Sequence, residues 1–137
     1  MPSHPLPDAE RNRLLESARS ALNCAYARYS NFRVAAAVLS DAGEIFTGVN
    51  VENASYGLTN CAERSAIFTA VRERKSSKLR LRAVAVVTGD DVPCSPCGAC
   101  RQVISEFAED CRVIFKGQDG YLDMSIQDLL PYSFRLS

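Results

Sequence analysis

The amino-acid sequence predicts a layered α/β/α domain, in which helices cover both faces of a mixed, roughly five-stranded sheet. The chain has 137 residues, of which 47% are hydrophobic, and this size suits one domain with a sizeable core. Stretches with helical spacing alternate with apolar and β-branched runs in the order αββαβαββα. Such alternation is typical of a sheet covered by helices. We therefore expect residues 1–137 to form a single domain, with residues 1–7 as a flexible arm.

The first half of the chain predicts one helix followed by a pair of strands. Apolar residues recur at helical spacing from Asp8 to Ala27, which predicts a helix over that range. Val34 to Leu39 is a continuous apolar run, and a turn at Gly43 separates it from a second run, Ile45 to Val51. We expect these two runs to pair as a hairpin at the centre of the sheet.

The second half predicts helices that alternate with strands. Apolar spacing predicts a helix from Ala62 to Val71, and the β-branched run from Leu81 to Thr88 predicts a buried strand. A third helix has its apolar face from Cys100 to Phe107, with Ser95 as N-cap and Pro96 at its first position. The last elements are a strand from Arg112 to Lys116, a turn at Gly117 to Gly120, a short strand, and a helix capped by Ser125 and stopped by Pro131.

Charge and composition narrow the classes of partner. Sixteen basic and sixteen acidic residues cancel, so we expect no broad positive field for nucleic acid or an anionic membrane. The proline-rich start does not resemble a signal peptide, and no apolar run approaches membrane-spanning length. A cytoplasmic protein with a small-molecule partner is therefore expected. In reducing cytosol, the six cysteines indicate metal binding or thiol chemistry rather than disulfides.

The stretch "CSPCGAC" contains two overlapping C-x-x-C spacings. Cys97 is expected in the first turn of the third helix, and Cys100 lies three residues later on the same face, so both sulfurs can bind one ion. The free N–H groups and the dipole at a helix N-terminus lower thiol pKa values and favour the thiolates that zinc requires. Two buried thiols that merely pack are the alternative. Cys94 precedes the cap and need not point toward the same ion.

A third ligand has to come from another part of the chain. The single histidine, His4, lies in the proline-rich start and is expected to be a solvated bystander. Asn60 can cap the second helix and thereby place Cys61 in its first turn, as predicted for Cys97. With Cys61, Cys97 and Cys100 as ligands, the fourth position of a tetrahedral zinc ion stays open, which is typical of a catalytic site.

Two residues that follow Cys61 have competing interpretations. Asn60 and Glu63 have the spacing of a capping box, which would make the role of Glu63 structural. Beside an open zinc site, the carboxylate of Glu63 would instead take a proton from water and deliver it to a leaving group. Arg64 can reach the Cys61 sulfur and, through hydrogen bonds to the ligand sulfurs, draw negative charge from the three thiolates. The alternative for Arg64 is an ordinary surface ion pair.

The candidate metal ligands Cys61, Cys97 and Cys100 lie in two segments with a strong family resemblance. "NVENASYGLTNCAERSA" (Asn50 to Ala66) and "SPCGACRQ" (Ser95 to Gln102) resemble the small, homotetrameric zinc-dependent cytidine deaminases. Their C-x-E followed by P-C-x-x-C is a variant of the H-x-E signature of zinc deaminases, whose mechanism is established for the class and is not inferred from this sequence. "YARYSNFRVAAAVL" and "LLPYSF" extend the resemblance to nearly the whole chain, apart from the N-terminal arm.

The resemblance implies hydrolysis of the 4-amino group of cytidine or deoxycytidine, which yields ammonia and uridine or deoxyuridine, as in pyrimidine salvage. One Zn²⁺ per subunit, bound by Cys61, Cys97 and Cys100, would activate the water that attacks C4, and Glu63 would move the protons. It also implies a homotetramer with shared active sites. The implied nucleoside-binding residues are Phe32, Asn50, Glu52, Tyr56, the backbone of Ala62 and, from a neighbouring subunit, Phe134.

Two other functions remain open at this point. A non-catalytic zinc-binding module with four cysteines would use Cys94, which stands where the family is expected to have an aliphatic residue. A polynucleotide cytidine deaminase would keep the chemistry, but zero net charge and an N-x-E motif suited to free sugar hydroxyls favour a nucleoside. Core packing is the alternative role for Phe32 and Tyr56, and Asn50 and Glu52 have an alternative role as turn residues.

Overall fold

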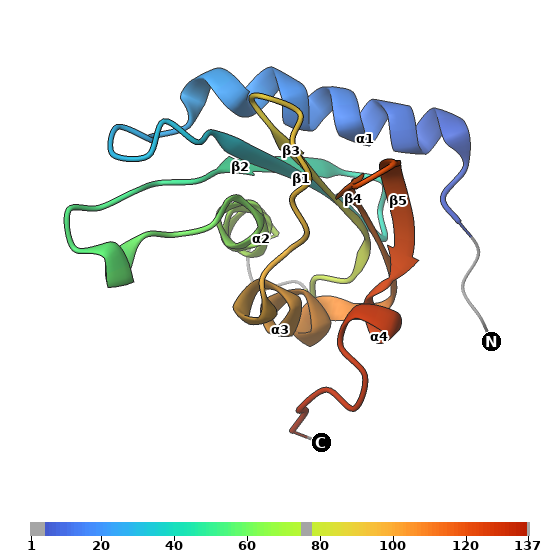
Figure 1. Ribbon diagram of the computed structural model, residues 1–137. Helices are drawn as coiled ribbons and strands as arrows, with labels where there is room; N and C mark the ends of the chain where they lie inside the picture. The colour runs from blue at the N-terminus through green and yellow to red at the C-terminus, as the bar shows by residue number, and fades with distance from the viewer. Residues whose placement is uncertain (1–4, 75–77, 137) are drawn as a thin grey trace.

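The computed structural model describes residues 5–74 and 78–136, and its elements follow the predicted order (Figure 1). The helices are α1 (Asp8–Ala21), α2 (Ala62–Glu73), α3 (Gly98–Phe107) and α4 (Ile126–Leu129). The strands are β1 (Val34–Ser40), β2 (Ile45–Val49), β3 (Leu81–Thr88), β4 (Ala108–Gly117) and β5 (Gly120–Ser125). They form one sheet in the order β2-β1-β3-β4-β5, with β3 and β4 parallel and the other neighbours antiparallel.

Two apolar cores lie on opposite faces of this sheet, because successive side chains of a strand point to opposite sides. The even-numbered residues of β1 from Val34 to Val38 belong to the core beneath α2, α3 and α4. The odd-numbered residues from Ala35 to Leu39 belong to the core beneath α1. Figure 1 shows α1 on one side of the sheet and the other three helices on the opposite side. The predicted layered α/β/α domain with a mixed sheet is therefore confirmed.

One boundary each of α1, β2 and β4 differs from the prediction. Helix α1 ends at Ala21 instead of Ala27, and a short 3-10 turn follows it. Tyr26 pairs with Val51 outside the main sheet, and this long-range pairing prevails over the local helical spacing. For the same reason β2 ends at Val49 and does not reach Val51. Strand β4 begins directly after α3, at Ala108 rather than Arg112.

The N-terminal end of the domain differs from the prediction, whereas the cap of the last helix agrees with it. Leu6 is buried in the core beneath α1, and its N–H donates to a carboxylate oxygen of Asp123 at 3.0 Å, so the expected arm is anchored there. His4 lies outside the described residues. Ser125 caps α4 as predicted, because its hydroxyl accepts the N–H of Gln127 at 3.2 Å.

Helix α2 lies unusually close to β2 because of Gly48. A Cβ atom at position 48 would lie 2.2 Å from the backbone nitrogen of Ala66, and 2.7 and 2.8 Å from backbone atoms of Ser65 and Ala62. Only glycine allows this approach of strand to helix. The position of α2 on the sheet, and of the residues at its start, therefore depends on the absence of a side chain at Gly48.

Candidate metal centre and active site

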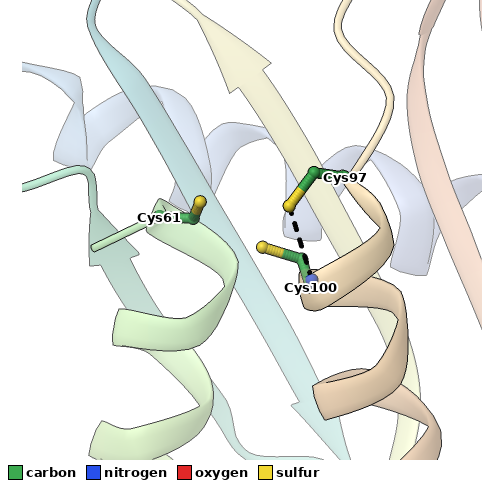
Figure 2. Close-up of side chains that lie close together, drawn as sticks. All are labelled: Cys61, Cys97 and Cys100. Atoms are coloured by element: carbon green, nitrogen blue, oxygen red, sulfur yellow. Dashed lines mark hydrogen bonds between the residues drawn. The ribbon is translucent and has the colours of Figure 1, made fainter. Parts of the chain in front are cut away.

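Helices α2 and α3 begin beside each other, and each brings cysteines to the same place. The sulfur atoms of Cys61, Cys97 and Cys100 lie within 4.8 Å of one another and point toward a common centre (Figure 2). Zinc–sulfur bonds of about 2.3 Å in tetrahedral geometry put ligand sulfurs about 3.8 Å apart. The three sulfurs are thus a soft, closely spaced donor set that fits zinc.

The start of α3 differs from the prediction and explains how Cys97 and Cys100 come together. The N-cap is Cys97, with φ −68° and ψ 169°, and not Ser95, so Cys97 precedes the first turn. Its sulfur occupies the position of a capping oxygen and accepts the N–H of Cys100 at 3.5 Å. Both sulfurs therefore lie at the positive end of α3, where backbone N–H groups favour thiolates.

The N-cap of helix α2 also lies one residue later than predicted. Cys61 is its N-cap, whereas the side chain of Asn60 donates to the hydroxyl of Ser65 at 3.2 Å. The capping-box interpretation of Glu63 is therefore wrong, because Asn60 is not the cap residue. The N-caps of two helices, α2 and α3, are both cysteines whose sulfurs belong to the same group.

The charge around Cys61 favours its thiolate. Arg64 donates through Nη2 to the Cys61 sulfur at 3.1 Å, so the predicted reach from i to i+3 is confirmed. A hydrogen bond from Cys100 and the guanidinium of Arg64 lower the pKa of Cys61 to about 5. The same pairing and burial raise the pKa of Cys100. The guanidinium of Arg64 thus faces the sulfur group.

Glu63 is almost fully buried next to these sulfurs. Its side chain is 5% exposed and lines the same hollow as Cys61 and Cys97. Burial, and to a smaller extent the nearby Cys61 thiolate, raise the pKa of the Glu63 carboxyl. A buried carboxyl whose pKa is raised holds its proton more tightly than an exposed one, which suits it to general acid–base work.

The hollow beside the sulfurs has a volume of about 230 Å³ and holds half of the residues implied for nucleoside binding. Phe32, Asn50 and Ala62 line it together with Glu63. Glu52 and Tyr56 line a neighbouring hollow of about 210 Å³, and Thr59 lines both. Phe134 lines neither and is 68% exposed in the single chain.

Asn50 and Glu52 each hold a segment of backbone that forms the wall of these hollows. The side chain of Asn50 accepts the N–H of Val34 at 2.9 Å and donates to the carbonyl of Phe32 at 2.8 Å. The carboxylate of Glu52 accepts the N–H groups of Tyr29 and Ser30 and the Ser30 hydroxyl, which lower its pKa. Both residues shape the site, and their contact with a sugar stays a prediction.

Sequence reasoning assigned no part in nucleoside binding to several residues of the larger hollow. They are Val34, Thr59, Asn60, Ser95 and Cys94. A usable signal existed, because Asn60 directly precedes Cys61, Ser95 lies two residues before Cys97, and Val34 lies two residues after Phe32 on an extended segment. Strand periodicity and adjacency to a ligand would have found all three.

Cys94 does not complete a site with four cysteines. Within the described residues, the sulfur group consists of Cys61, Cys97 and Cys100, and Cys94 is not among them. Cys94 is half-buried, its N–H donates to the carbonyl of Lys116 at 3.0 Å, and burial raises the pKa of its thiol. It therefore forms part of the wall of the hollow as a neutral side chain.

Family, sequence and structure comparisons all match this chain to cytidine deaminases. Residues 8–116 match the family model described as cytidine and deoxycytidylate deaminase zinc-binding region. A cytidine deaminase of Halalkalibacterium halodurans is 42% identical over 91% of this chain and 94% of its own length, and one of Mycobacterium tuberculosis is 40% identical over 96% and 94%. The crystal structure of a Burkholderia pseudomallei cytidine deaminase superposes with a TM-score of 0.80 at 45% identity, covering 90% of this chain and 98% of that one.

None of the helices in residues 5–74 and 78–136 is long and apolar enough to cross a bilayer.

Proposed function

The chain belongs to the family of the cytidine and deoxycytidylate deaminase zinc-binding region, and we propose from this that it hydrolyses cytidine and deoxycytidine to uridine and deoxyuridine. The reaction consumes one water molecule and releases the 4-amino group as ammonia. One observation carries the proposal: the three sulfurs of Cys61, Cys97 and Cys100 lie at a hollow that the buried carboxyl of Glu63 also lines.

The donor set suits a zinc ion with one open position, and Cys61, Cys97 and Cys100 would hold one ion per subunit. When bound, zinc supplies a Lewis acid that makes a water molecule acidic enough to attack a carbon atom at neutral pH. Arg64 draws negative charge from the Cys61 thiolate through its hydrogen bond at 3.1 Å. That hydrogen bond would offset part of the negative charge that three thiolates place around the ion.

Glu63 performs the proton transfers in this proposal. It takes one proton from the attacking water and passes it to ring N3. It then takes the second proton of that water, now on the hydroxyl at C4, and delivers it to the departing amino group. Its raised pKa, which results mainly from burial, supports the protonated state that the second half of the reaction needs. The near-complete burial of its side chain excludes bulk water, which would otherwise compete for the proton.

The remaining residues of the two hollows would position the nucleoside. Phe32 would pack against it, the backbone of Ala62 would contact the base, and Tyr56 would lie near the sugar. Asn50 and Glu52 would bind the sugar hydroxyls with the hydrogen-bonding capacity that their backbone contacts leave free. The larger hollow beside the sulfurs supports this assignment, because the base must reach the metal and the sugar must extend away from it.

We also propose a homotetramer in which Phe134 reaches a neighbouring subunit's nucleoside site, in a cytoplasmic enzyme of pyrimidine salvage. The exposure of Phe134, and of Tyr132 and Leu136 around it, supports a role for this tail outside its own subunit. A reducing cytoplasm would keep the cysteine thiols available for zinc.

An ultraviolet assay tests the proposed function. Cytidine, deoxycytidine and a cytosine-containing oligonucleotide are incubated with the purified protein, with and without a zinc chelator. We expect loss of cytidine and deoxycytidine, no loss from the oligonucleotide, and inhibition by the chelator. Turnover of the oligonucleotide alone would support a polynucleotide deaminase instead, and no turnover of any substrate by zinc-loaded protein would leave only a binding module.

A further inference from the structure

Three chain segments form a small ladder outside the main sheet. Val51 lies in the middle, paired in parallel with Tyr26 on one side and antiparallel with Asn60 on the other. The N–H of Val51 donates to the carbonyl of Asn60 at 3.0 Å, and the N–H of Asn60 donates back to the carbonyl of Val51 at 2.9 Å. On the other side, Tyr26 bonds the backbone of Asn50 and Glu52 at 3.0 and 2.9 Å. Val51 thus joins the segment that contains Tyr26 to the residue that precedes the N-cap of α2.

This ladder is the last backbone pairing of the chain before Cys61. Residues 53–58 are all exposed, and a single 3-10 turn at Tyr56–Leu58 is their regular structure. Asn60 follows this exposed segment and directly precedes Cys61, whose sulfur belongs to the metal group. Cys61 has no side-chain cap hydrogen bond of its own. The two backbone hydrogen bonds between Val51 and Asn60 therefore set the direction in which the backbone enters α2, alongside the hydrogen bond of Arg64 to the Cys61 sulfur.

A metal site tolerates only small changes in the positions of its ligands, so a change in the direction of the chain at Cys61 has a measurable effect on metal binding. Ligand distances in a metal site are held to within about 0.2 Å. Loss of a hydrogen bond in the ladder would remove a restraint on the peptide group that joins Asn60 to Cys61, and the Cys61 sulfur moves with that peptide group. The side chain of Asn60 offers one further restraint, its hydrogen bond to Ser65 at 3.2 Å. The two ladder bonds are shorter and act on the backbone itself.

We propose that Val51 is a positioning residue for the metal centre, which acts through its backbone on Asn60 and so on the Cys61 sulfur. Its side chain is 45% exposed and lines neither hollow, so Val51 acts without touching metal or substrate. The inference rests on the proposed function in one respect, namely that the three sulfurs bind a metal ion. Asn50 and Glu52, on either side of Val51, shape the nucleoside hollows, so one tripeptide would organise both halves of the site.

Cobalt titration of the metal-free protein tests this inference, because cobalt bound by thiolates gives a charge-transfer band that reports the geometry as well as the affinity. Val51→Pro removes the N–H that donates to Asn60 and leaves both Tyr26 bonds in place. We expect its dissociation constant for cobalt to rise about tenfold, as for loss of other outer-shell contacts, with a changed band. Val51→Ala keeps every backbone bond and should stay within about twofold of the wild type.

Two further variants keep the test decisive. Replacement of Val51 by its α-hydroxy acid removes only the N–H and keeps the side chain, so it gives the answer if the proline variant does not fold. Ile114→Val, in the core beneath α1, loses about 1 kcal/mol of stability without touching the ladder and should bind cobalt like the wild type. Two results would overturn the inference but leave the proposed function intact. One is an unchanged cobalt affinity after removal of the Val51 N–H, and the other is a loss of cobalt affinity in Ile114→Val as large as that in the Val51 variants. A wild-type chain that binds no cobalt overturns the proposed function as well.

Discussion

Substitution of Gly48 by alanine should separate helix α2 from the sheet and thereby disrupt the metal centre. The added Cβ would lie 2.2 Å from the backbone nitrogen of Ala66, whereas Cβ contacts under 3.0 Å essentially do not occur, so helix and strand must part by at least 0.8 Å. The obstructing atoms belong to the backbone of Ala66, Ser65 and Ala62 and cannot rotate away. Overpacking of this kind costs about 3 kcal/mol.

The displacement matters for the site because Cys61 stands at the N-cap of the same helix. A shift of 0.8 Å is several times the tolerance of about 0.2 Å for metal–ligand distances. We expect Gly48→Ala to lower the urea midpoint by about 1–2 M and to weaken zinc binding at least about tenfold. Urea unfolding, zinc content and turnover of cytidine, all on the same preparation, measure these effects.

A matched alanine substitution controls for the general effect of removing a glycine. A Cβ at Gly89 would lie 3.6 Å from the Cβ of Arg33, which is an ordinary contact, so Gly89→Ala should change stability by less than about 0.5 kcal/mol. If Gly48→Ala unfolds at the same urea concentration as Gly89→Ala and retains full zinc content, the close approach of α2 to β2 does not position the site.

Four further predictions concern the site and the assembly. Cys61→Ser, Cys97→Ser and Cys100→Ser should each lose zinc and turnover while Cys94→Ser keeps both; an empty site in Cys94→Ser, with zinc retained in one of the others, would contradict the ligand assignment. Glu63→Gln should keep its fold and zinc but lose turnover about 10²–10⁴-fold, as measured by metal analysis and the ultraviolet assay, and near-normal turnover would remove its role in proton transfer. Arg64→Gln should lower turnover strongly with zinc still bound, and adding Cys61→His should recover part of the loss; no recovery at equal zinc content would refute charge compensation. Sedimentation at assay concentrations should show a tetramer, and a fully active monomer would refute shared active sites.

Local sequence patterns were sufficient for the fold class and for the group of three cysteines. Helical and strand periodicity predicted the element order, and the spacing of Cys97 and Cys100 placed both sulfurs at one helix end. The caps of α2 and α3 were missed, because cap scales favour hydroxyl and amide side chains. In the structure the sulfur of Cys97 accepts the N–H of Cys100 in their place.

Long-range pairing accounts for most of the other differences. Tyr26 and Asn60 both pair with Val51, so the predicted first helix ends early and Asn60 does not cap α2. Such partners lie far apart in sequence, and no local pattern indicates them. The close approach at Gly48 is equally invisible, since glycine in a strand is compatible with a bulge, a bend or a contact.

Zinc titration of the metal-free protein, with turnover of cytidine recorded at each step, tests the central claim most directly. The account predicts no turnover without metal and a linear rise that ends at one zinc ion per subunit, with the same endpoint for Cys94→Ser and none for Cys97→Ser. Full turnover by the metal-free protein, or a rise that continues well beyond one ion per subunit, would contradict an active site built on Cys61, Cys97 and Cys100.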